Sequence, residues 1–301
     1  MNQNSDQSIH VNSETSIPAA LNYWEIFLTD QRRSKYTIKS FLGDLRLMQK
    51  FLPPDATIGQ ITTSDLNRFI DWLEKGRGRN IPCSPKSLSR RITSLKSFFA
   101  WLSDHGRIRF DPAKEILQRT VISPLPQVLS TEELLKALET ARKMMAGEKP
   151  DSRPFVLFKL LLDTGIKKSE CLNIRLNHVV LGENEKYLFV RYPDQKDRNK
   201  ERKINLSDEF MNAYHRYIEE YQLTDALFPW SQRRLEYILE DISKAAQIDK
   251  HISFSMCRWN SALIDMKSGL ERDLIRQKLG ISKIQWREID MKLKELAKNH
   301  I

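Results

Sequence analysis

Hydrophobic residues recur at three- and four-residue intervals through most of the first 104 positions, as on one face of a helix. Leu21, Trp24 and Leu28 begin this pattern. Pro53-Pro54 and residues 76–82 interrupt it, because proline and glycine break helices. Four helices are therefore predicted: one from Ile17, one after Tyr36-Thr37, one after Ser64 as N-cap, and one over about residues 85–103.

The pattern changes after residue 129. Ser130 and Glu133 form a Ser-x-x-Glu capping box, which predicts a helix start. Residues 154–162 are apolar nearly all round, which predicts a helix buried in a core and ended by Gly165 in the left-handed conformation. Residues 187–191 and 202–206 read as two short strands around the polar turn 194–200. Further helices are predicted over about residues 208–221, 231–246, 255–267, 271–278 and 282–299.

These elements predict a mainly α protein with two domains. Residues 1–16 are polar and are expected to form a mobile tail. Residues 17–119 would form a helical domain, and residues 120–129, with two prolines and no helical period, an extended linker. Residues 130–301 would form a mostly helical domain with one small antiparallel sheet. A chain of 301 residues is long enough for two cores.

The charge balance favours a polyanionic partner. The chain has 49 Lys or Arg against 39 Asp or Glu, a net charge of +10. Residues 1–120 carry 18 basic against 12 acidic residues, which leaves 31 against 27 for the rest. The fourth helix carries basic residues opposite its apolar stripe, and they form either an ordinary solvated face or a phosphate-contacting one. They are Lys86, Arg90, Arg91 and Lys96.

Several classes of protein are disfavoured. Cys83, Cys171 and Cys257 are an odd number far apart, which argues against a disulfide framework and for a reducing compartment. No CxxC or HExxH spacing suggests a metal site, and no cofactor is expected. The chain has no apolar run of membrane-spanning length and no signal-peptide pattern, so a cytoplasmic protein without membrane contact is expected.

Motifs in both halves resemble one family. Residues 164–170 read Thr-Gly-Ile-Lys-Lys-Ser-Glu, residues 199–206 read Asn-Lys-Glu-Arg-Lys-Ile-Asn-Leu, and residues 255–259 read Ser-Met-Cys-Arg-Trp. In this order they resemble catalytic-domain landmarks of the tyrosine recombinase (phage integrase) family. In the first half, Ser-Lys-Tyr-Thr, Ile-Thr-Thr-Ser-Asp-Leu and Ser-Leu-Ser-Arg-Arg-Ile-Thr-Ser-Leu-Lys-Ser-Phe-Phe resemble the SAM-like core-binding domain of that family, which clamps one side of the DNA.

The same resemblance implies an eroded active site. In the family, two arginines clamp the scissile phosphate, lysine and histidine handle protons, and a tyrosine attacks. Here Lys167 stands at the first arginine position, and Asp197 at the hairpin lysine position with Lys196 beside it. The second arginine is kept as Arg258, but the family's three histidine positions and its tyrosine position are occupied by Ser255, Trp259, Ile281 and Asp290. No tyrosine occurs in the 64 residues after Tyr237.

The resemblance therefore implies a non-catalytic protein that binds duplex DNA, as an accessory or regulatory subunit in recombination or integration. Two alternatives remain: a recombinase subunit that receives its tyrosine in trans, and a protein-interaction scaffold. A second copy or an active recombinase would dock on a face of the last helix formed by Ile284, Ile289, Leu293 and Leu296. The expected DNA contacts are Lys35, Thr37, Lys39, Lys86, Arg90, Arg91, Lys96, Lys167, Lys168, Arg198, Lys200, Arg202 and Arg258.

Overall fold

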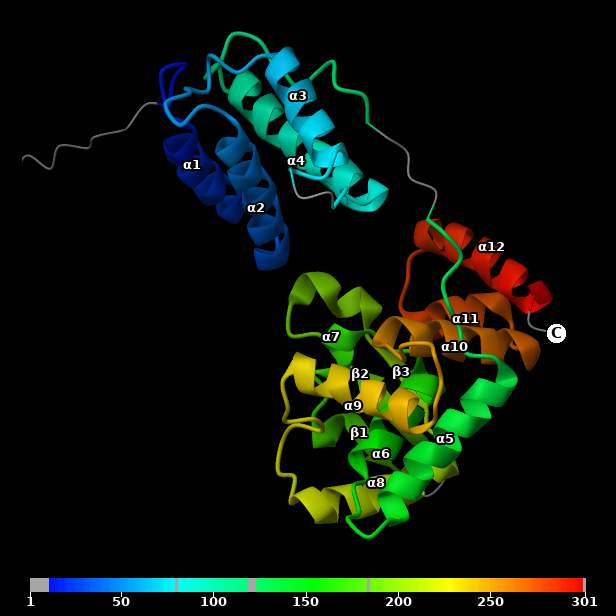
Figure 1. Cartoon of the computed structure of the whole chain (residues 1–301). Helices are drawn as coiled ribbons and strands as arrows, with labels where there is room; N and C mark the ends of the chain where they lie inside the picture. The colour runs from blue at the N-terminus through cyan, green and yellow to red at the C-terminus, as the bar shows by residue number, and fades with distance from the viewer. Residues whose placement is uncertain (1–10, 79–80, 119–122, 183–184, 300–301) are drawn as a thin grey trace, which may run out of the picture. The chain divides into compact units, whose positions relative to one another are not determined.

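The computed structural model describes residues 11–78, 81–118, 123–182 and 185–299 (Figure 1). The chain divides into two compact units, residues 1–123 and 124–301.

The first unit contains the four predicted helices, α1 (Ile17–Asp30), α2 (Lys35–Phe51), α3 (Thr63–Glu74) and α4 (Pro85–Asp104). Trp24 of α1 is fully buried at their centre and stacks on Phe41 of α2, with 5.7 Å between ring centroids. The N-cap predicted for α3 was wrong. Thr62 caps this helix, because Asp65 completes a capping box by accepting a hydrogen bond from the Thr62 N–H at 2.9 Å.

The segment before α1 is packed on the first unit. Val11 is buried, and the guanidinium of Arg107 donates to its carbonyl at 3.1 Å. The amide of Ile58 donates to the carbonyl of Thr15 at 3.0 Å. Residues 11–16 are therefore ordered structure, which corrects that part of the predicted tail, whereas residues 1–10 lie outside the described residues.

The core of the second unit surrounds α6 (Arg153–Thr164), whose side chains are buried on nearly every side as its all-apolar sequence predicted. The Ser130–Glu133 capping box is confirmed at the start of α5. Gly165 ends α6 with a φ of 58°. Helices α5 (Thr131–Ala146), α8 (Asp208–Tyr221), α9 (Gln232–Ala245) and α10 (Phe254–Lys267) pack against α6. The unit also contains three short helices, α7 (Lys168–Cys171), η1 (Leu176–His178) and η2 (Gln195–Lys200). Its last two helices are α11 (Arg272–Leu279) and α12 (Lys283–Asn299).

The sheet has the antiparallel order β1-β2-β3. Its strands are β1 (Val179–Leu181), β2 (Lys186–Val190) and β3 (Arg202–Asn205). Leu188, Val190 and Ile204 point into the core and are buried. The hairpin of β2 and β3 was predicted, whereas β1 was not, because three residues are too few to show an alternating pattern.

The end of the predicted linker belongs to the second unit. Residues 123–130 form neither helix nor strand, but Val128 and Leu129 are buried. The amide of Leu129 donates to Asn260 Oδ1 at 3.0 Å, and Asn260 Nδ2 donates back to the Leu129 carbonyl at 3.0 Å. Because Asn260 is itself buried in α10, this double hydrogen bond anchors the segment; residues 119–122 lie outside the described residues.

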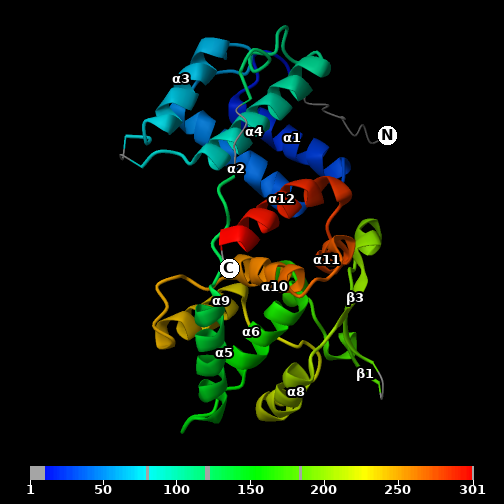
Figure 2. The same cartoon turned by 90° about the vertical axis from the view of Figure 1, so that its right-hand side faces the viewer.

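Helix α12 packs on α10 and α11 of its own chain (Figure 2). Leu293 and Leu296 are buried in a cluster with Val128, and Ile289 is partly buried beside them. Ile284 is the one member of the predicted docking face that points outward, with 79% of its surface exposed. The prediction that these four residues await a neighbouring copy was therefore wrong for three of them, because the chain covers them itself.

Candidate functional site

Lys167 is positioned by the end of α6. The left-handed Gly165 leaves no room for a side chain, since a Cβ there would lie 2.9 Å from Leu279 and 3.0 Å from the hydroxyl of Ser261. The chain turns and Lys167 precedes α7, where its amide donates to Glu170 Oε2 at 2.7 Å. Its side chain reaches the carbonyl of Gly280 at 3.4 Å and lies 4.0 Å from Glu170 Oε1.

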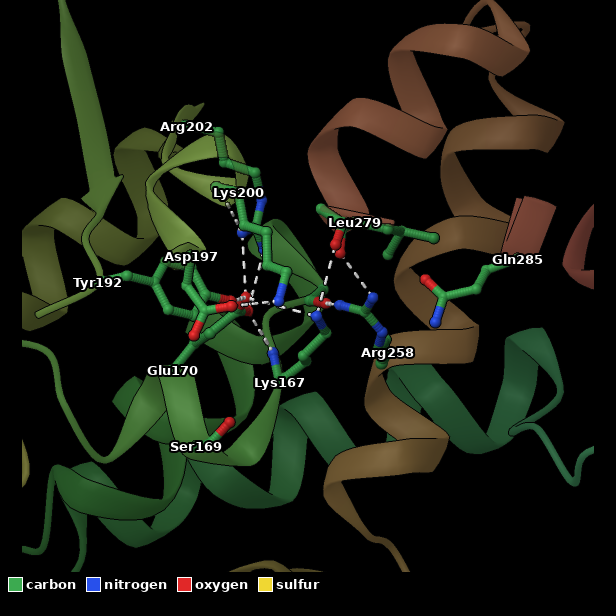
Figure 3. Close-up of polar contacts among 12 residues, drawn as sticks. Lys167, Ser169, Glu170, Tyr192, Asp197, Lys200, Arg202, Arg258, Leu279 and Gln285 are labelled. Atoms are coloured by element: carbon green, nitrogen blue, oxygen red, sulfur yellow. Dashed lines mark hydrogen bonds and ion pairs between the residues drawn. The ribbon is translucent and has the colours of Figure 1, made fainter. Parts of the chain in front are cut away.

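Glu170 is the buried centre of the site (Figure 3). Arg202 donates to both of its carboxylate oxygens, at 3.0 and 2.9 Å, and the hydroxyl of Tyr192 donates to Oε1. Burial alone would raise the pKa of Glu170, but the hydrogen bonds and charge of Arg202 and the Tyr192 bond bring it below its usual value. Burial and the bond to Glu170 raise the pKa of Tyr192. Glu170 is therefore an ionised carboxylate of α7 that binds residues of the β2–β3 hairpin.

Arg258 of α10 joins two helix ends. Its guanidinium donates to the carbonyl of Gly165 at the end of α6, and to the carbonyl of Leu279 at the end of α11, at 2.6 Å. Burial lowers the pKa of Arg258 to about 10, with Glu170 opposing the shift and Arg202 adding to it. Arg258 thus has a structural role as well as a place at the edge of a hollow.

Two hollows meet at Lys167. The first, of about 750 Å³, is lined by Lys167, Lys168, Ser255 and Arg258 together with residues of α9. The second, of about 530 Å³, is lined by Lys167, Lys200, Arg202, Ile281 and Gln285, among others. Burial lowers the pKa of Lys167; Glu170 opposes this shift, and the charges of Arg258, Arg202 and Lys200 reinforce it. Cations that repel one another across a solvent-filled hollow favour the binding of an anion such as a phosphate group.

Among the residues of the first hollow that were not predicted are Arg233 and Tyr237 of α9, and His251 in the loop before α10. The hydroxyl of Tyr237 accepts a hydrogen bond from Arg233 Nε at 2.6 Å. The i, i+4 spacing of Arg233 and Tyr237 was visible in the sequence and places them on one helix face. Nothing in the sequence showed that this face borders Lys167.

The other residues aligned with catalytic positions do not line either hollow. Lys196 is exposed and lies 3.5 Å from Asp194, while Asp197 pairs with Lys200 at 2.5 Å. Trp259 packs in the apolar cluster beneath α12. Asp290, which the resemblance aligns with the tyrosine position, has a side chain only 15% exposed, 2.9 Å from Lys294 Nζ and 3.5 Å from Arg272.

In the first unit, two of the residues predicted to contact DNA form ion pairs with a buried carboxylate instead. Asp44 of α2 is 5% exposed, and it pairs with Arg90 and, at 3.5 Å, with Arg91. Ser94 also donates to it, at 2.8 Å. Arg91 is only 16% exposed, so its predicted place on a solvated basic face was wrong.

The remaining predicted contacts differ in their surroundings. Lys35, Lys39 and Lys86 are exposed on α2 and α4. The hydroxyl of Thr37 lies 2.8 Å from that of Ser34 in the N-cap of α2, and Lys96 donates to the carbonyl of Lys114 at 3.2 Å. In the second unit, Lys168 pairs with Glu236 at 2.7 Å, and Arg198 is exposed on η2.

Within the described residues, no group of three His, Cys, Asp or Glu side chains could hold a metal ion. In the same part of the chain, no helix is long and apolar enough to cross a membrane. Cys171 and Cys257 are buried, and burial raises the pKa of both thiols.

The helical first unit and the second unit with its β-hairpin each match a model of one protein family. Residues 21–106 match the "Phage integrase, N-terminal SAM-like domain", and residues 127–289 match the "Phage integrase family". The chain therefore belongs to the phage integrase family, that of the tyrosine recombinases.

The chain is similar to full-length members of this family. It is 25% identical over 291 residues to tyrosine recombinase XerC of Lacticaseibacillus casei (strain BL23), covering 91% of this chain and 92% of that protein. It is 23% identical over 286 residues to tyrosine recombinase XerD of Rickettsia prowazekii (strain Madrid E), covering 89% and 90%.

Solved structures share the fold. A lambda integrase (75–356) dimer bound to a COC' core site aligns with a TM-score of 0.70 at 15% identity, over 89% of this chain and 96% of that one. XerH site-specific recombinase bound to difH substrate aligns with a TM-score of 0.66 at 19% identity, over 86% and 78%.

Proposed function

We propose that this chain is a non-catalytic duplex-DNA-binding member of the family, acting as an accessory or regulatory subunit in DNA recombination or integration. The observation that carries the proposal is the contrast between Asp290 and the cations. Asp290 stands at the tyrosine position and is held in ion pairs with Lys294 and Arg272. Lys167 and Arg258 still border a hollow suited to phosphate.

The rest of the pocket supports the same proposal. Phosphoryl transfer to a side chain needs a nucleophile, positive charge arranged around the phosphate, and a proton donor for the leaving group. Lys167 supplies charge without the planar two-pronged geometry of arginine. Ser255 and Ile281 stand where the family has histidines, and neither titrates near neutral pH. Binding of a phosphate is therefore retained while its cleavage loses most of its machinery.

Duplex DNA is the ligand that the charge favours. The chain has a net charge of +10, and Lys35, Lys39 and Lys86 are exposed on the first unit. Solved relatives are named as bound to DNA sites. Phosphate contacts of this kind position a protein on DNA without reading its sequence. Bound in this way, the protein would be associated with the nucleoid in the cytoplasm.

A binding experiment tests whether the chain binds duplex DNA. The affinity for a fluorescein-labelled duplex would be measured by anisotropy between about 50 and about 200 mM salt. With four phosphate contacts, the affinity should fall roughly 100-fold over that range, because each contact releases counterions. A protein that shifts no duplex at the lower salt, or binds without salt dependence, would be a scaffold for other proteins instead.

A trapping experiment tests whether the chain is non-catalytic. A nicked suicide duplex accumulates any covalent protein–DNA adduct, and none is expected from the chain alone. An adduct that forms with the wild type and disappears in Tyr237→Phe would make the chain an enzyme that uses the tyrosine of its first hollow. An adduct on an added active recombinase that requires this chain's Arg258 would establish donation of the tyrosine in trans.

A further inference from the structure

The outer face of the three-stranded sheet carries aromatic and basic side chains outside the site described above. Because Leu188 and Val190 point into the core, Tyr187 and Phe189 of β2 point to the opposite face, where both are half-buried. Lys203 Nζ lies 4.5 Å from the centre of the Tyr187 ring. The guanidinium carbon of Arg191 lies 4.8 Å from the centre of the Phe189 ring. Each ring therefore has one cation against it.

The two cations of this face carry uncompensated charge. Lys203 and Arg191 are exposed and, among the described residues, neither has a carboxylate partner. Their neighbour Lys186 differs, since it pairs with Asp208 at 2.5 Å. Burial, and then the charge of Arg191, lower the pKa of His178. Flat rings beside free positive charge suit a ligand that has both aromatic groups and phosphates.

A hollow of about 580 Å³ lies beside Tyr187 and Lys203. Asn205, directly opposite Tyr187 in the β2–β3 register, also lines it and supplies an amide donor and acceptor. The acidic residues at its edge are Asp208, which Lys186 neutralises, and Glu185. The hollow thus offers room for a planar polar group next to an exposed cation.

We propose that the sheet face formed by Tyr187, Phe189, Arg191 and Lys203 binds an unpaired DNA strand. Bases would stack on the two rings, and the two cations would turn to the phosphates. Rings two residues apart along a strand lie about 7 Å apart, whereas duplex bases follow one another about every 3.4 Å. Successive bases can therefore reach both rings only in a strand that is drawn out of the duplex stack. This site is independent of the duplex-binding function proposed above.

The test measures binding of a fluorescein-labelled thymidine oligonucleotide of about 12 nucleotides by the full chain, a length within the usual range of such sites. The variant is Tyr187→Leu with Phe189→Leu, which keeps apolar side chains on the sheet. The expected loss is about tenfold per ring, or about 100-fold in all. Phe110→Leu is the matched control, because Phe110 is 74% exposed in the first unit and has Arg109 over its ring at 5.1 Å. This control should bind like the wild type.

Three outcomes would overturn the proposal: no binding of the single strand by the wild type, binding by the double variant within about twofold of the wild type, or equally tight binding of an abasic strand, which has phosphates but no bases. Thermal melting of the variants identifies any loss of folding. The double variant should bind duplex DNA as the wild type does. Failure of the wild type to bind duplex would remove the proposed function and leave this site standing.

Discussion

Among the described residues, each unit contains one buried carboxylate next to cations, Asp44 in the first and Glu170 in the second, and the two differ in which of these cations they leave exposed. Asp44 binds Arg90, Arg91 and Ser94 between α2 and α4. Glu170 binds Arg202 and Tyr192, while Lys167, 4.0 Å away, still borders two hollows. A buried carboxylate therefore marks a candidate ligand site only where a neighbouring cation still borders a hollow, as Lys167 does.

The largest expected effect comes from removing the charge at the centre of the second unit. Glu170→Gln should lower the free energy of unfolding by about 3–5 kcal/mol at neutral pH, because Arg202 is left buried without its counter-ion. The folded pKa of Glu170 lies below its unfolded value, so the ionised carboxylate stabilises the fold above about pH 4.3 and loses this effect as pH falls through the folded pKa. Urea unfolding across this pH range should show the wild type and variant converging in acid.

The corresponding change in the first unit should cost less. Asp44→Asn is expected to lower stability by about 2 kcal/mol, because the amide can still accept one hydrogen bond. Arg90 is also 43% exposed and can turn to water, unlike Arg202 at 9%. Calorimetry of the full chain would measure the shift. A loss of stability as large as that of Glu170→Gln would show that Arg90 and Arg91 are as unable to turn to water as Arg202 is.

Two variants of α4 separate a residue that stabilises the fold from a residue that contacts DNA. Arg91→Ala should lower stability by about 1–2 kcal/mol while leaving duplex affinity nearly unchanged. Lys86→Ala should do the reverse, with little change in stability and a salt slope reduced by about 0.9. Anisotropy titrations of both folded variants measure this difference. Equal losses of affinity would place Arg91 in the DNA interface after all.

A small effect on stability is also expected at Lys167. Burial lowers its pKa, so its charged form carries a desolvation cost that Lys167→Met would remove, and stability should change by less than about 1 kcal/mol. Duplex affinity should still fall, with Lys149→Met as the exposed-lysine control. Marked destabilisation of Lys167→Met would mean that Lys167 is a structural ion-pair partner of Glu170, as Arg91 is of Asp44.

The sequence predicted the helices of eight or more residues, the hairpin, the left-handed Gly165 and the capping box at Ser130, because local periodicity and capping chemistry determine these features. It did not predict the short helices α7, η1 and η2, that Asp44 engages Arg91, or that Tyr237 lines the same hollow as Lys167. Those contacts join residues distant in the chain, and their partners depend on how the helices pack. The resemblance supplied the identity of Lys167 and Arg258 as pocket residues, but not the pairing of Asp290 with Lys294.

Val128 and Leu293 share one apolar cluster, and Asn260 holds Leu129 beside it. A premature stop codon before Leu293 would therefore uncover Val128 in the segment that leads into the second unit, in addition to shortening the protein. Such truncations should destabilise the second unit whether or not the protein cleaves DNA. The packing of Leu293 and Leu296 against Val128 constrains this helix independently of any catalytic role.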